Sequence, residues 1–145
     1  MTMFSLFRAL VAVSVVAFAS PAAAAPQIVE GTWMETKSTS CNNTSSCTAV
    51  FTAVQAGKTL VVQNLACKLG TQQTALVRSL YLFNGVQTAF VNAGAPTTFN
   101  GLREFAVNTE VLFVVKAAAI PRVLFFSTGI GTQSINCTLT GTLRP

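Results

Sequence analysis

The sequence has no histidine and no aspartate, and all four of its acidic residues are glutamates. Without histidine, neither a Ser–His–Asp triad nor a Cys–His pair can form, and His-containing zinc and non-haem iron sites are excluded. Calcium sites usually draw on aspartate, and no glycine-rich phosphate loop of the Walker or dinucleotide type is present. These absences remove most familiar active sites. We therefore expect a protein that is not an enzyme and that holds no cofactor and no metal.

Charged side chains are also few. The 145-residue chain has nine basic and four acidic residues, and the basic ones are scattered singly. Nucleic-acid binding needs a concentrated basic surface, so we expect no nucleic-acid partner.

Paired carboxylates could still support a glycosidase. Glu30 and Glu35 would face opposite ways on one strand, whereas a turn at Asn108-Thr109 would bring Glu104 and Glu110 together. Because isolated glutamates on strand faces are usually solvated, we interpret these residues as surface.

Residues 1–24 have the layout of a secretory signal peptide. Arg8 precedes a nearly unbroken run of small apolar residues over 9–19, and Ala22-x-Ala24 fits the small-residue rule for cleavage after Ala24. The run is shorter than the roughly 20 strongly apolar residues of a membrane span. A short signal of this kind is typical of bacteria. We predict a secreted or periplasmic protein without a transmembrane span, in which residues 25–145 form a single domain.

Four cysteines, Cys41, Cys47, Cys67 and Cys137, lie after the predicted signal peptide. An even number in an exported chain predicts two disulfides, and the spacing does not suit a zinc site. The polar segment 41–47 favours a short Cys41–Cys47 bridge. Period-two alternation over residues 135–143 turns Cys137 inward, where Cys67 could meet it. We favour this pairing, and the other two connectivities stay open.

Short β-like runs separated by turn residues cover nearly the whole chain after residue 25, and threonine, valine and phenylalanine are frequent. The predicted fold is all-β, a two-sheet antiparallel β-sandwich of jelly-roll or Ig-like topology with eight to nine strands. A single sheet closed on itself is the alternative. The runs are 31–37, 48–54, 58–69, 75–83, 86–92, 97–99, 102–107, 110–117, 122–127 and 134–143.

Turn signals separate several of these runs. Asn84-Gly85 and Asn100-Gly101 predict hairpins in which both turn residues have positive φ. Ala56-Gly57 and Gly129-Ile130-Gly131 predict two further turns.

Two predicted strands, Val111–Val115 and Val123–Phe126, are apolar on both faces. Either both faces are covered within the fold, or the outer face meets a partner.

The stretch Phe51–Cys67 and the closing stretch Cys137–Leu143 resemble small exported bacterial β-sandwich proteins of unassigned function. The resemblance rests on an apolar strand, an Ala-Gly-Lys turn, a long apolar strand and a Thr-Gly-Thr-Leu ending. It implies the β-sandwich fold and no activity.

We therefore expect a non-enzymatic exported protein that acts as a structural or interaction component of the bacterial envelope. Its expected partners are a second copy of itself or an envelope protein or glycan. The alternative is a small glycan- or ligand-binding module, because sugar sites on β-sandwiches commonly use exposed aromatic rings. Trp33 and Tyr81 are the candidate ligand contacts, although Trp33 could instead close one end of the core.

Overall fold

The computed structural model describes residues 25–72 and 74–145, so the predicted signal peptide, residues 1–24, lies outside the described residues. All described secondary structure is β-strand and no helix is present in these two ranges, which confirms the all-β prediction. Eight strands pair antiparallel in one hydrogen-bonded sheet. The strands are β1 (Gln27–Val29), β2 (Thr32–Val50), β3 (Thr59–Gln72), β4 (Val77–Phe83), β5 (Thr88–Val91), β6 (Pro96–Phe99), β7 (Leu102–Val115) and β8 (Arg122–Arg144).

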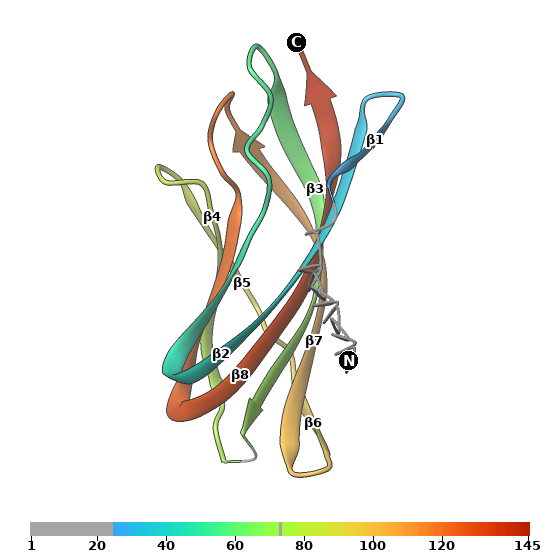
Figure 1. Cartoon of the computed structure of the whole chain (residues 1–145). Helices are drawn as coiled ribbons and strands as arrows, with labels where there is room; N and C mark the ends of the chain where they lie inside the picture. Colours follow the sequence, from blue (N-terminus) through green and yellow to red (C-terminus); the bar gives the residue numbers. More distant parts are fainter. Residues whose placement is uncertain (1–24, 73) are drawn as a thin grey trace, which may run out of the picture.

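The two longest strands, β2 and β8, organise the sheet. They pair from Thr32–Thr142 to Val50–Arg122, with irregular register in β2 between Cys41 and Ser46. Both strands turn back at this place, at the lower left of Figure 1, so that the sheet has two arms. We call this place the bend.

The two arms are defined by their strands. The large arm contains β1, β3, β6 and β7 with residues 32–41 of β2 and 133–144 of β8. The small arm contains β4 and β5 with residues 46–50 of β2 and 122–127 of β8.

Alternate residues of both arms face a common hydrophobic core. Trp33, Leu65 and Phe105 enter it from the large arm, and Leu80 and Phe125 enter it from the small arm. Each such large apolar side chain stabilises the fold by about 1.5–3 kcal/mol on burial. The other face of each arm is turned away from this core, and it therefore presents its side chains to the outside.

Two disulfides join the chain with the pairing that the sequence argument favours. Cys41 and Cys47 lie in the same strand, β2, on either side of the bend. Six extended residues would span about 20 Å, yet the two Cα atoms are 5.6 Å apart. This bridge therefore fastens the bend of β2. Cys67 and Cys137 are direct partners on β3 and β8 and lie in the core.

Buried polar groups support the bend from inside. The Gln133 side-chain amide donates to the Thr44 carbonyl oxygen at 2.6 Å and to the Ser127 hydroxyl at 2.7 Å. The Ser127 hydroxyl in turn donates to the Gly129 carbonyl oxygen at 2.6 Å. Irregular pairing leaves backbone acceptors without ladder partners, and buried acceptors need replacements. The side chains of Gln133 and Ser127 supply them.

The predicted turn at Gly129–Gly131 lies at the bend, where β8 turns back, but it does not end the strand. Strand β8 runs through these residues without interruption, and Gly131 pairs with Thr44. Glycine at position 131 allows a neighbouring segment to pack closely against β8, because a Cβ atom there would collide with the Gln72 side chain. The predicted runs 122–127 and 134–143 are thus two parts of one bent strand.

The hairpin signals are partly confirmed. Asn100 and Gly101 have φ of 48° and 76° and join β6 to β7, as predicted. Asn84-Gly85 also lies in a hairpin, between β4 and β5, but only Gly85 has positive φ. The Asn84 side-chain oxygen instead accepts from the Val86 and Gln87 amides at 3.0 and 2.7 Å, which closes a longer loop.

Candidate interaction surface

The two aromatic residues proposed as ligand contacts lie in different environments. Trp33 is fully buried in the core, so its ring is not available to a ligand in solvent. Its indole nitrogen has no hydrogen-bond partner in the described part of the chain. Tyr81 is half-buried on the outer face of β4. Of the two, only Tyr81 can belong to a surface site.

Tyr81 is the centre of a three-ring cluster on the outer face of the small arm. Its ring centroid lies 4.8 Å from that of Phe90 on β5 and 6.1 Å from that of Phe126 on β8. Phe90 is the direct cross-strand partner of Tyr81. Phe90 is 79% exposed and Phe126 is 39% exposed. We call these three residues the aromatic surface. Its exposed rings are typical of contact sites rather than of ordinary surface.

A shallow hollow of about 260 Å³ lies beside Phe90. The polar residues at its wall are Arg78, Ser79 and Asn92. Neither Arg78 nor Arg122, the two charged residues on the strands of the small arm, forms an ion pair with any residue in the described ranges. All four glutamates of the chain lie outside the small arm. This side of the molecule is therefore aromatic and positively charged.

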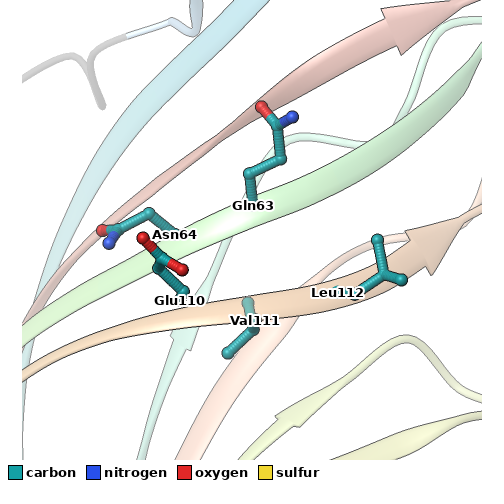
Figure 2. A pocket seen from close by; sticks show the side chains of 5 residues that line it. All are labelled: Gln63, Asn64, Glu110, Val111 and Leu112. Carbon is teal, nitrogen blue, oxygen red and sulfur yellow. The ribbon is translucent and has the colours of Figure 1, made fainter.

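A second hollow, of about 540 Å³, opens on the outer face of the large arm between β3 and β7. Gln63, Asn64, Glu110, Val111 and Leu112 line it, and we call it the Glu110 hollow. Figure 2 shows Glu110 and Leu112 on one side of β7 and Val111 on the other. Leu112 is 83% exposed.

The Glu110 hollow lies at a break in strand register. The pairing of β3 with β7 shifts between Val62 and Asn64, and such bulges redirect side chains. The Asn64 side-chain nitrogen donates to the Asn108 side-chain oxygen at 3.2 Å. The Glu110 carboxylate has no hydrogen-bond or ion-pair partner in the described ranges. The hollow thus combines an unpaired negative charge with an exposed leucine.

The two doubly apolar strands each have a covered and an exposed face. Phe113 and Phe125 are buried in the core, whereas Leu112, Val114 and Phe126 are exposed. The outer faces of both strands therefore remain available to a partner.

Two further carboxylates, those of Glu35 and Glu104, stabilise the fold, and the interpretation of the glutamates as surface residues is wrong for Glu35. Glu35 is buried; its two carboxylate oxygens accept from the Thr52 amide at 3.1 and 3.0 Å, and one lies 2.8 Å from the Lys37 ammonium. Glu104 pairs with Lys68 at 3.0 Å. The predicted turn at Asn108-Thr109 is wrong, because β7 pairs continuously with β3 there.

Glu104 and Glu110 consequently lie on one strand, about 20 Å apart along its length. They cannot act as a catalytic pair, for which the carboxyl groups are about 5–9.5 Å apart.

Comparison with known protein families, with curated proteins and with solved structures finds no match for this chain. Within residues 25–72 and 74–145, no group of three or more His, Cys, Asp or Glu residues could hold a metal ion. Nor does any helix in those ranges have the length and hydrophobicity to cross a membrane.

Sequence reasoning identified Tyr81 but missed Phe90, Arg78 and the Glu110 hollow. The Asn84-Gly85 hairpin signal could have indicated Phe90, because it places residues near 90 opposite residues near 81. No local signal marks the Glu110 hollow, which depends on a shift in long-range pairing.

Proposed function

We propose that this chain is an exported, non-enzymatic interaction protein of the bacterial envelope, and that the aromatic surface is its contact site. The observation that carries the proposal is the exposure of Phe90 and Phe126 around Tyr81 on the outer face of the small arm. Tyrosine and arginine are among the residues that most often dominate binding energy at interfaces, and phenylalanine is enriched there.

Export is part of the proposal. The signal-like segment 1–24 and the two disulfides both support it, since disulfides persist in oxidising compartments. We further propose that the two arms act as the two layers of a β-sandwich. The common core between them supports this description, although hydrogen bonding through the bend links them into one sheet.

The alternative function, a glycan- or ligand-binding module, has one specific observation in its favour. The hollow beside Phe90 combines an exposed ring with the polar side chains of Arg78, Ser79 and Asn92. A ring that can stack on a sugar and a few convergent hydrogen-bonding groups are what a small glycan site needs.

The proposed function can be tested by sedimentation with isolated bacterial envelopes. Protein purified after export from a bacterial host should pellet with envelope fragments, and Phe90→Ser should weaken this binding about 30-fold, the effect of losing one aromatic anchor. Val29→Ser is the matched control, because Val29 is an exposed apolar residue on β1, in the other arm.

The outcomes separate the two functions. If wild-type protein stays in the supernatant, envelope association is refuted. If Phe90→Ser pellets like wild type, the aromatic surface is not the contact site. Release of the wild-type protein by soluble glycan fragments from the same envelopes would favour the glycan-binding module.

A further inference from the structure

The two exposed hollows have opposite chemistry. The hollow of the small arm presents Arg78 beside the exposed ring of Phe90. The Glu110 hollow presents a carboxylate beside the exposed side chain of Leu112. Each hollow therefore offers one charge and one apolar group, and the charges have opposite sign.

The hydrogen-bonding groups that line the Glu110 hollow restrict the chemistry of the group that can bind there. The Asn64 amide nitrogen is engaged by Asn108, so its side-chain oxygen remains as an acceptor beside the Glu110 carboxylate. The Gln63 side-chain oxygen already accepts from the Thr142 hydroxyl at 3.1 Å. A guest at the Glu110 carboxylate must therefore donate hydrogen bonds. A guanidinium group is planar, donates only, and can bind a carboxylate with two parallel hydrogen bonds.

We propose that Arg78 and Phe90 of one copy dock into the Glu110 hollow of a second copy. The Arg78 guanidinium then pairs with the Glu110 carboxylate, and the Phe90 ring packs on Leu112. This contact rests on the proposed function, since it uses the aromatic surface, and it names the partner as another copy of the same chain.

The contact joins surfaces on opposite sides of the common core, the outer face of the small arm and the outer face of the large arm, so one partner cannot engage both at once and the contact is head-to-tail. Arg78 and Phe90 belong to the small arm, whereas Glu110 and Leu112 belong to the large arm. After one contact forms, each copy retains one unused surface. A heterologous contact of this kind generates a ring or an open array rather than a closed twofold dimer.

The test is the molar mass of the purified full-length export product, measured by light scattering from micromolar to millimolar concentration. Wild-type mass should rise with concentration beyond that of a dimer. Glu110→Arg and Arg78→Ser should each weaken association at least tenfold, because each removes one side of a charge-assisted hydrogen bond. Glu30→Arg and Arg144→Ser are the controls, since they make the same charge changes elsewhere and should associate like wild type.

Mixing the two variants tests the head-to-tail geometry. Glu110→Arg keeps Arg78 and Phe90, and Arg78→Ser keeps the Glu110 hollow. An equimolar mixture of the two variants should therefore form a discrete 1:1 dimer that cannot grow. Formation of this dimer also shows that both variants are folded. A mixture that stays monomeric although wild type associates would overturn the proposal.

Two further results would also overturn it. One is a wild-type protein that remains monomeric up to millimolar concentration. The other is association that Glu110→Arg leaves unchanged. Because this test contains only purified protein, a negative result leaves the envelope sedimentation assay to decide the proposed function separately.

Discussion

The two disulfides are expected to contribute unequally to stability, and the difference can be worked from their places in the chain. The Cys41–Cys47 bridge closes a sequence separation of 6, and Cys67–Cys137 closes one of 70. In the loop-entropy model these closures stabilise the folded state by about 2 and about 4 kcal/mol. Replacing either pair by alanine also leaves a small cavity, because Cys47, Cys67 and Cys137 are all buried, and this adds about 1 kcal/mol in each variant.

The assay is urea unfolding of two double variants, Cys41→Ala/Cys47→Ala and Cys67→Ala/Cys137→Ala, each of which keeps the other bridge. We expect the free energy of unfolding to fall by about 3 kcal/mol in the first and about 5 kcal/mol in the second. The first variant should also show faster amide exchange around residues 42–46, because its bridge fastens the bend. Equal losses in the two variants, or a larger loss in the first, would refute the reasoning.

Three further substitutions test buried features by urea or thermal unfolding. Glu35→Leu should destabilise by about 3–5 kcal/mol, because it removes a buried carboxylate that accepts from the Thr52 amide and hydroxyl and pairs with Lys37; Glu35→Gln should lose less, and equal losses would argue against a role for the charge. Gln133→Leu should lose about 2–3 kcal/mol by removing the donor to buried acceptors at the bend, and a neutral result would exclude that role. Gly141→Ala should lose more than about 2 kcal/mol, since its Cβ would collide with the Val61 carbonyl oxygen; an unchanged melting temperature would contradict this packing.

Local alternation was enough to predict part of the fold. Residues 135–143 alternate between apolar and polar side chains, and the structure places Ile135, Cys137 and Leu139 in the core and leaves Asn136 exposed. Asn100-Gly101 likewise determines a two-residue turn because both residues tolerate positive φ. These features depend on near neighbours in the sequence, so the sequence pattern reveals them.

The bend could not be predicted in this way. The polar segment 38–46 and the glycines at 129 and 131 have the composition of loops, yet they continue strands β2 and β8. What keeps them in the sheet is pairing between segments some 90 residues apart, together with the buried amide of Gln133. Neither contact has a local signature. From the sequence alone, Gln133 is expected on the surface, because it lies in a threonine-rich run and one of its hydrogen-bond partners, Thr44, is distant in the chain.

The distribution of the four glutamates links the fold to the proposed contact. Glu35 is buried in an ion pair, Glu104 pairs with Lys68, and Glu30 lies at the β1–β2 turn. Glu110, in contrast, lines a surface hollow beside the exposed side chain of Leu112. A single carboxylate suffices to receive one guanidinium through two parallel hydrogen bonds. Because acidic groups are so few in this chain, the proposed contact would make Glu110 its specific attachment point.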